Sequence, residues 1–254
     1  MLTSKGEHAV PKEQVLRDIQ SNSSALQRYG NFYVGSSDLG AILRYEIAAS
    51  FLSWVPGAIG LGLRKALYPS IFRSMGTDVV WGRNIVLRHP NKISVGSGVA
   101  IDDNCLLDAK GGGDAGIVIG DAVLVARSTI IQCKGGAITI GDHATIGSQT
   151  QIGSVGGIFI GSNVLISGQC YFGGGRYKTE DANTPMVKQG LYSKGSLVIE
   201  DDVWIGAGAL IQDGVHIGCG SVIGAGAVIR EDVPAMTVVV PNQPLVLLPR
   251  EKGD

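Results

Sequence analysis

From Val95 onward the chain repeats a six-residue unit. An aliphatic residue is usually followed by glycine, and a small or branched residue stands two positions before it. A short period sustained in this way is typical of a solenoid, in which short strands stack coil upon coil. The residues two positions earlier, such as Ile93, Val99 and Cys105, are compact enough to stack inside a narrow prism. The aliphatic positions form six groups of three: Val95, Ile101, Leu107; Ile119, Val125, Ile131; Ile140, Ile146, Ile152; Ile160, Ile166, Phe172; Ile199, Ile205, Ile211; and Ile217, Ile223, Ile229. The sequence therefore predicts an all-β solenoid of about six coils.

Composition supports a single elongated domain and excludes some classes of function. The chain has 254 residues and 38 glycines, and the glycines recur at the expected corners of the coils. A formal net charge of −1 without a long basic run argues against nucleic-acid binding. The first residues lack the apolar core of a secretory signal, and the four cysteines have no tight spacing. We therefore expect a cytoplasmic protein.

The chain divides into three parts: a helical segment over 1–79, the solenoid over 80–233 and a tail over 234–254. Residues 47–63 carry no charge, are flanked by Arg44, Arg64 and Lys65, and contain a Pro56-Gly57 break. That break argues against a straight transmembrane helix. Two alternatives remain: a broken hairpin that packs on the solenoid end or on a neighbouring subunit, or a hairpin that contacts a membrane peripherally, with its basic flanks at the headgroups.

The spacing between coils predicts where ligands bind. Successive coils start 24, 21, 20, 39 and 18 residues apart, whereas three uninterrupted units span 18. The extra residues follow the third side of the coil, so they should project from one edge, which is usually the binding face. These insertions run from Gly111 to Gly116, Lys134 to Ala137, Ser154 to Gly157 and Gly173 to Ser196. The last one, 173–196, is long enough to be functional.

These hexapeptide triplets resemble the left-handed parallel β-helix acyltransferases over roughly residues 80–240. The string IEDDVWIGAGALIQDGVHIGCGSVIGAGAVIREDVP, from Ile199 to Pro234, is similar to the last coils of the maltose, serine and polysaccharide O-acetyltransferases. The upstream string WVPGAIGLGLRKALYPSIF further resembles the branch that decorates polysaccharide and lipopolysaccharide. The resemblance implies left-handed coils, a homotrimer with active sites between adjacent prisms, and acetyl-CoA as acyl donor.

The resemblance also implies a catalytic base in the long loop, and here the chain departs from the pattern. Family members carry a histidine that falls on Tyr177 or Lys178, and no histidine lies between His143 and His216. Phenols and amines are ordinarily protonated at neutral pH, so either replacement would need an altered environment to act as a base. His143, on a corner after Ile140, could instead reach a neighbouring subunit. Tyr177, Lys178 and His143 are thus the catalytic candidates.

The remaining candidate residues concern the two substrates. The resemblance implies that Asp108, which follows Leu107 in the first coil, binds the acceptor, because related enzymes often carry a polar acceptor-binding residue at this place. Glu180 and Asp181 are alternative proton acceptors in the long loop and are also predicted to lie on the acceptor side. An outward-facing indole, smooth glycine corners and a basic residue are predicted to bind CoA. They are Trp204, Gly206, Ala207, Gly208, Gly224, Ala225, Gly226 and Arg230.

The sequence thus predicts an acetyl-CoA-dependent O-acetyltransferase that acts on a hydroxyl of a sugar or of a polysaccharide or lipopolysaccharide precursor. The alternative is a catalytically silent hexapeptide-repeat trimer that serves as a scaffold or regulatory subunit, which the absent loop histidine favours. A zinc enzyme is not expected, because His89, His143 and His216 are too dispersed to share a metal.

Overall fold

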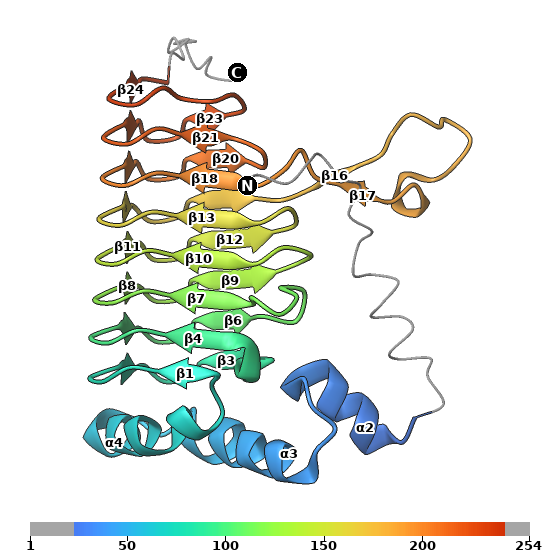
Figure 1. The fold of residues 1–254 in the computed structure, drawn as a ribbon, viewed down its shortest axis with the longest axis vertical. Coiled ribbons are helices and arrows are strands. Elements are labelled where there is room, and N and C mark those ends of the chain that lie inside the picture. The colour runs from blue at the N-terminus through green and yellow to red at the C-terminus, as the bar shows by residue number, and fades with distance from the viewer. Residues whose placement is uncertain (1–22, 242–254) are drawn as a thin grey trace, which may run out of the picture.

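The computed structural model describes residues 23–241 and is a parallel β-solenoid with a group of helices at one end (Figure 1). Three sheets run along the solenoid, and each coil contributes one strand to each sheet. This confirms the predicted all-β solenoid with an N-terminal helical segment.

The first sheet, sheet A, has seven strands. They are β1 (Ser74–Met75), β4 (Ile93–Val95), β7 (Ile117–Ile119), β10 (Ile138–Ile140), β13 (Ile158–Ile160), β18 (Leu197–Ile199) and β21 (His216–Ile217). Sheet B has eight, which are β2 (Val80–Trp81), β5 (Ala100–Ile101), β8 (Leu124–Val125), β11 (Thr145–Ile146), β14 (Leu165–Ile166), β19 (Trp204–Ile205), β22 (Val222–Ile223) and β24 (Val238–Val239). Sheet C has seven, which are β3 (Val86–Arg88), β6 (Leu106–Asp108), β9 (Ile130–Cys133), β12 (Gln151–Ser154), β15 (Tyr171–Gly173), β20 (Leu210–Gln212) and β23 (Val228–Ile229).

The predicted inward positions stack in register along each sheet. In sheet A, Ile119 pairs with Val95 on one side and with Ile140 on the other, and Ile160 follows in the same column. All four side chains are buried. Because every coil repeats the register of the one before it, the period of six becomes a continuous aliphatic core along the axis.

One coil precedes the six that the pattern predicted. It consists of β1, β2 and β3, in which Met75, Trp81 and Leu87 take the inward positions opposite Val95, Ile101 and Leu107. A methionine and a tryptophan do not match an aliphatic-glycine unit, so the sequence pattern missed this coil. Strands extend from Ser74 to Val239, beyond the expected bounds of 80 and 233, and the end of the predicted tail (242–254) lies outside the described residues.

The corner glycines that directly follow an inward aliphatic residue, such as Gly120, are required for a reason other than backbone freedom. A Cβ on Gly120 would lie 2.3 Å from Oδ1 of Asp142 in the next coil. That carboxylate oxygen accepts a 2.8 Å hydrogen bond from the backbone N–H of Asp121. The left-handed backbone instead occurs two residues later, at Ala122 (φ 54°) after Gly120 and at His143 (φ 59°) after Gly141. Gly120 is therefore required by the close approach of a carboxylate, not by its own φ.

The N-terminal segment covers the first coil. Its elements are α2 (Ala25–Tyr29), the π-helical turns η1 (Gly30–Val34) and η2 (Ile47–Leu52), α3 (Leu39–Glu46), α4 (Gly57–Leu67) and the 3-10 turn η3 (Tyr68–Ser70). The helical path is interrupted between η2 and α4 at Pro56-Gly57, where Gly57 has φ 66°. Within residues 23–241, no helix is both long and apolar enough to cross a bilayer.

A buried arginine joins these helices to the solenoid. Arg64 in α4 is 2% exposed. Its guanidinium donates to the backbone oxygens of Leu52 (2.8 Å), Val55 (2.8 Å) and Trp81 (3.0 Å). From the second arm of the broken hairpin it therefore binds two carbonyls of the first arm, before the Pro56-Gly57 break, and one carbonyl of β2. One side of residues 47–63 thus packs on the solenoid end, as the first alternative predicted, and the other side is exposed.

The inward register can be tested with one inward and one outward substitution in two strands of the same coil. Ile146 in β11 is fully buried, and Thr139 in β10 faces outward from sheet A. Ile146→Asp should abolish soluble expression or lower the free energy of unfolding by several kcal/mol, because an unpaired carboxylate would be buried. Thr139→Asp should melt close to the wild type, because this side chain lies on the outer face of sheet A. Equal melting temperatures for the two variants, measured by circular dichroism, would contradict the register.

The role of Arg64 can be tested against its neighbour Lys65, whose side chain is 64% exposed. Arg64→Met should lower the free energy of unfolding by about 2 to 4 kcal/mol, because three buried carbonyls lose their donor. Lys65→Met should change it by less than about 1 kcal/mol. Urea titrations followed by circular dichroism measure both values, and a small effect of Arg64→Met would show that the helices are held by apolar packing alone.

Candidate functional site

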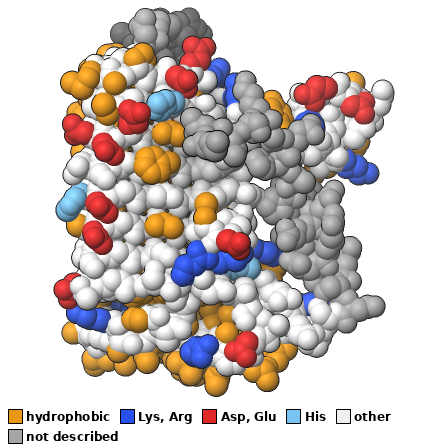
Figure 2. All heavy atoms as spheres, in the orientation of Figure 1, with side chains coloured by type: hydrophobic (Ala, Val, Ile, Leu, Met, Phe, Trp, Pro, Cys, Tyr) orange, Lys and Arg blue, Asp and Glu red, His pale blue; other side chains and the backbone are white. Residues whose placement is uncertain are grey.

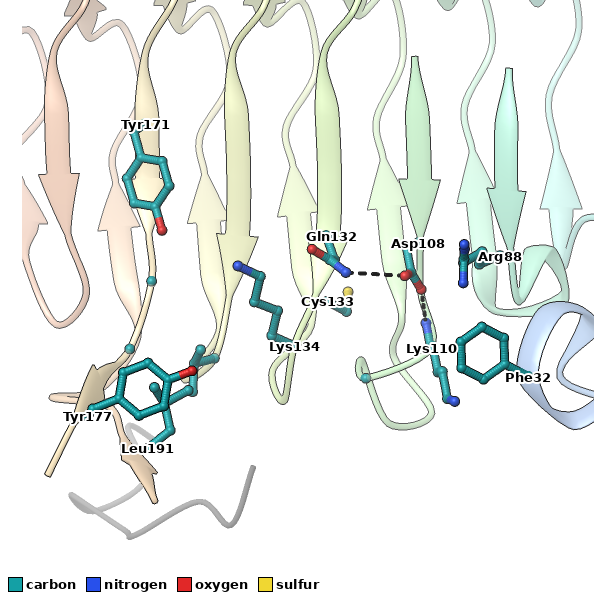
Figure 3. A pocket seen from close by; sticks show the side chains of 14 residues that line it. Phe32, Arg88, Asp108, Lys110, Gln132, Cys133, Lys134, Tyr171, Tyr177 and Leu191 are labelled. Atoms are coloured by element: carbon teal, nitrogen blue, oxygen red, sulfur yellow. Dashed lines mark hydrogen bonds between the residues drawn. The ribbon is translucent and has the colours of Figure 1, made fainter. Parts of the chain in front are cut away.

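A pocket of about 510 Å³ lies along the edge where strands of sheet C turn back toward sheet A (Figure 3). This is the edge from which the insertions were predicted to project. Its lining runs from the helical segment to the long loop and consists of Phe32, Arg88, Asp108, Lys110, Gly111, Gln132, Cys133, Lys134, Val155, Tyr171, Gly174, Gly175, Tyr177 and Leu191. Residues from five successive coils therefore contribute to one pocket.

Three polar residues form a ladder at one end of the pocket. Arg88, Asp108 and Gln132 follow the inward leucine or isoleucine of β3, β6 and β9, and they pair in register. Asp108 is 7% exposed. Its carboxylate accepts 2.9 Å from the backbone N–H of Lys110 and 3.3 Å from Nε2 of Gln132 (Figure 3). These two donors fix the direction in which the carboxylate faces the pocket.

The charge of the pocket is mainly positive. Its lining holds three cationic side chains, Arg88, Lys110 and Lys134, and one carboxylate, that of Asp108. The Lys110 ammonium lies 4.0 Å from the ring centroid of Phe32, and the Arg88 guanidinium lies 5.2 Å from the same ring. Cation–π contacts of this kind hold the charged ends in place. The arrangement can attract an anionic group beside a polar carboxylate.

The long insertion closes the other end of the pocket. It forms a small antiparallel hairpin of β16 (Arg176–Tyr177) and β17 (Leu191–Tyr192), with the 3-10 turn η5 (Met186–Lys188) between them. Its base is held by Asp213, which lies 3.9 Å from Arg176 and accepts 2.7 Å from the backbone N–H of Lys194. Beyond this anchor the loop stands away from the solenoid (Figure 1). Tyr177 lines the pocket and is 55% exposed.

Lys178, Glu180 and Asp181, the other predicted residues of the long loop, are not among the residues that line this pocket. Lys178 donates its backbone N–H to the Gly190 oxygen (3.0 Å) within the hairpin. Asp181 organises the loop tip, and hydrogen bonds from the Thr184 hydroxyl and the Asn183 backbone lower the pKa of its carboxyl. Glu180, next to it, is exposed and accepts from the backbone N–H of Thr179 (3.0 Å).

His143 lies on a different edge of the solenoid. It occupies the left-handed corner between sheet A and sheet B, exposed, and its backbone N–H donates to the Asp121 oxygen (2.8 Å). In neighbouring coils the same left-handed corner is taken by Ala122 and Asn163. Within one chain, His143 therefore does not join Asp108 and Tyr177.

The predicted CoA-binding glycines do meet at one corner. Gly206, Ala207 and Gly208 lie directly beside Gly224, Ala225 and Gly226 of the next coil, between sheets B and C. A Cβ on Gly206 would be 2.5 Å from the backbone nitrogen of Ala225, so the corner has no room for side chains there. Trp204 precedes this corner on the outer face of sheet B and is 50% exposed. Arg230 is exposed, but strand β23 separates it from this corner.

Sequence reasoning missed most of the pocket. Arg88, Lys110, Gln132 and Lys134 were not candidates, although Arg88 and Gln132 occupy the same position after an inward residue as Asp108 does. That shared position was a usable signal. Phe32 had none, because only the fold brings η1 to the pocket. Cys133 also lines the pocket, but burial raises the pKa of its thiol to about 12, so the thiol stays protonated and is a poor nucleophile.

Two family models match the chain within the solenoid. The bacterial transferase hexapeptide (six repeats) matches residues 196–231, and the hexapeptide repeat of succinyl-transferase matches residues 137–171. Among solved structures, an N-acyltransferase from Bacillus cereus in complex with dTDP and coenzyme A is 23% identical. It has a TM-score of 0.47, and the match covers 70% of this chain and 85% of that one.

Two curated relatives match the sequence. A probable acetyltransferase of Mycobacterium tuberculosis is 30% identical over 50% of this chain and 42% of its own length. The dTDP-4-amino-4,6-dideoxy-D-glucose acyltransferase of Escherichia coli is 32% identical over 66% of this chain and 77% of its own length. The repeat, the solenoid and this relative together show that the chain belongs to the hexapeptide-repeat acyltransferase family.

Proposed function

We propose that this protein transfers an acyl group, acetyl in the simplest case, from coenzyme A to a hydroxyl of a carbohydrate that carries a negative charge. The acceptor would be a sugar nucleotide or a polysaccharide or lipopolysaccharide precursor. The observation that carries the proposal is the pocket in which the Asp108 carboxylate is held among Arg88, Lys110 and Lys134. A CoA thioester donor supports a reaction in the cytoplasm, and that location is part of the proposal.

The pocket offers groups for both the charged part and the sugar part of such an acceptor. The cationic side chains can bind phosphate or another acidic group, and the rings of Phe32, Tyr171 and Tyr177 offer apolar faces for a sugar or a base. Asp108 can accept a hydrogen bond from the acceptor hydroxyl, and its position is fixed before the substrate arrives. Preorganisation of this kind lowers the cost of orienting the two reactants.

The chemistry is a direct transfer between the two substrates. The acceptor oxygen attacks the thioester carbonyl carbon, the carbon–sulfur bond breaks, and CoA leaves as the thiol with the proton that the hydroxyl loses. We assign Asp108 to accept the hydroxyl proton, with Tyr177 at the opposite end of the same pocket as the alternative. His143 remains a candidate only if a neighbouring subunit presents it. The smooth corner at 206–208 and 224–226, with Trp204 and Arg230, is assigned to the donor.

A second candidate is an amine acceptor. It is favoured by the relative from Escherichia coli, whose name specifies a 4-amino sugar linked to dTDP. The same carboxylate could hold an amine, so both acceptor types belong in the assay. The silent-scaffold alternative requires that no acceptor is acylated.

We also propose that the protein is a homotrimer. The outer face of sheet B carries a column of exposed apolar side chains, among them Val80 (50%), Leu124 (44%), Leu165 (46%) and Trp204 (50%). Exposed apolar area of this extent usually marks an interface. Three copies side by side would bury such columns and place each long loop beside a neighbouring solenoid.

Light scattering coupled to gel filtration tests the trimer. The full chain should elute with three times the mass of one chain, and Trp204→Asp should shift it to the monomer, because a carboxylate would be buried at the interface. Met236→Asp, at an 80% exposed position near the C-terminal end of the solenoid, is the control and should remain trimeric. A monomeric wild type at micromolar concentration would overturn the proposal.

Steady-state kinetics with acetyl-CoA and a panel of charged hydroxyl and amino sugars tests the site. Asp108→Asn should lower kcat by about 100-fold, because the proton acceptor is lost, with little change in affinity for CoA. The matched control is Asp114→Asn, an exposed aspartate in the neighbouring insertion that does not line the pocket. It should retain wild-type kcat.

The outcomes distinguish the assignments. If Asp108→Asn is active while Tyr177→Phe or Lys178→Met is inactive, the base lies in the long loop. If only His143→Ala is inactive, the base comes from a neighbouring subunit. Binding of CoA without transfer to any acceptor would favour the silent scaffold.

A further inference from the structure

The helices at the base of the solenoid expose a large apolar surface, which we call the base face. Its side chains are between 38% and 74% exposed and are those of Leu39, Leu43, Ile47, Phe51, Trp54, Ile59, Leu61, Leu63 and Leu67. Figure 2 shows apolar side chains gathered along this end of the molecule. Soluble chains rarely expose so many large apolar residues together unless another surface covers them.

The spacing of these residues shows that the base face is a continuous feature of the helices. Leu39, Leu43, Ile47 and Phe51 recur at every fourth residue through α3 and η2, so they lie on one side of the helical path. The opposite side of the same path packs on the solenoid through Ile42, Tyr45, Ala48 and Leu52, all of which are buried. The helical path is therefore apolar on the side that meets the protein and on the side that does not.

Helix α4 is inverted relative to a surface helix in water. It turns the charged Arg64 toward the solenoid, where the guanidinium is buried, and leaves Ile59, Leu63 and Leu67 outside. A helix that faces water normally does the reverse. The broken hairpin is thus anchored by its polar group and presents its apolar side outward, an arrangement that suits a non-aqueous exterior.

Charges of both signs lie around the base face, and those that no other described residue pairs with or hydrogen-bonds are the cations Arg44 and Arg73. Residues 47–63 carry no charge, and Arg44, Lys65 and Arg73 lie exposed at the ends of these helices. The nearby acidic groups are engaged within the chain. Asp38 accepts 2.7 Å from the backbone N–H of Ala41, Glu46 accepts from the hydroxyls of Tyr29 and Ser50, and Asp78 pairs with Lys65 at 3.1 Å.

We propose that the base face docks on the surface of a bilayer that contains anionic lipid. Phe51, Trp54 and the aliphatic side chains enter the boundary between headgroups and acyl chains, while Arg44 and Arg73 lie at the level of the headgroup phosphates. A second copy of the chain would bring the unpartnered Arg44 and Arg73 of the two copies together around the apolar surface, whereas anionic lipid complements them. The proposal goes beyond the acyltransferase function and stands without it.

Two features of the fold add to this inference. The base face closes the end of the solenoid, so copies related by the proposed three-fold axis would present their base faces in one plane, and a bilayer is flat enough to meet all of them. Their binding would then reinforce one another. Phe32, in the same helical segment, lines the candidate pocket, so docking would bring one end of that pocket toward the membrane.

Vesicle flotation of the full chain tests the proposal. The protein should float with vesicles of phosphatidylcholine and phosphatidylglycerol at 7:3 and float at least tenfold less with phosphatidylcholine alone. Phe51→Gln combined with Ile59→Gln should reduce flotation at least tenfold, because two exposed apolar anchors are lost. The matched control, Met236→Gln combined with Val240→Gln at the other end of the solenoid, should float like the wild type. Arg44→Gln should reduce binding about fivefold.

A quenching experiment locates the contact. Vesicles with brominated acyl chains should quench the fluorescence of the wild type and of Trp204→Phe, but not that of Trp54→Phe, which should still float. Absence of flotation with both kinds of vesicle would overturn the proposal. The proposal would also be overturned if light scattering gave the wild type twice the mass of the proposed trimer and gave the Phe51→Gln, Ile59→Gln variant the mass of the trimer. The base face would then pair two copies of the assembly.

Discussion

Successive coils are joined by parallel backbone hydrogen bonds at a fixed register, and this ladder is the constraint on which the rest of the structure depends. Each inward aliphatic residue meets its counterpart one coil away, as Ile119 meets Val95 and Ile140. A one-residue slip of a strand would turn its core side chains outward. The ladder therefore fixes both the core and the direction of every outward residue, including those of the pocket.

The candidate site lies at the edge between sheets C and A, where the insertions leave the coils. Insertions after sheet C leave the register of the strands intact, so they can vary in length without disturbing the core. Polar residues at the ends of β3, β6 and β9 are stacked by the same ladder that stacks the core, which places Asp108 between Arg88 and Gln132. The segments that follow β6 and β9 then supply Lys110 and Lys134, and the long loop supplies Tyr177. A rigid ladder and variable loops together give a preorganised pocket.

The end of the solenoid poses a different problem, because a ladder has unpaired strands and an open core at its first coil. The aromatic residues Tyr68, Phe72 and Trp81 fill that end, with ring centroids of Tyr68 and Phe72 at 5.4 and 4.9 Å from that of Trp81. Arg64 then fixes the broken hairpin over them through three backbone carbonyls. Because the helices cover the core with one side, their other side makes no contact with the solenoid. That exposed apolar side is the base face.

The sequence by itself determined the repeat, the inward residues, the edge that carries the insertions and the place of Asp108, because a period of six assigns each position to a side of the coil. The glycine corner at 206–208 and 224–226 followed from the same period. Whether Tyr177, Lys178 or His143 is catalytic stays a prediction.

Only the tertiary structure decided which distant residues meet. It added a first coil whose Met75 and Trp81 do not match the repeat, brought Phe32 to Lys110, and placed His143 on another edge from Asp108. It also showed that Arg64 turns inward while its apolar neighbours turn outward. Helix packing and loop closure depend on contacts between segments far apart in the chain, and a local period carries no information about them.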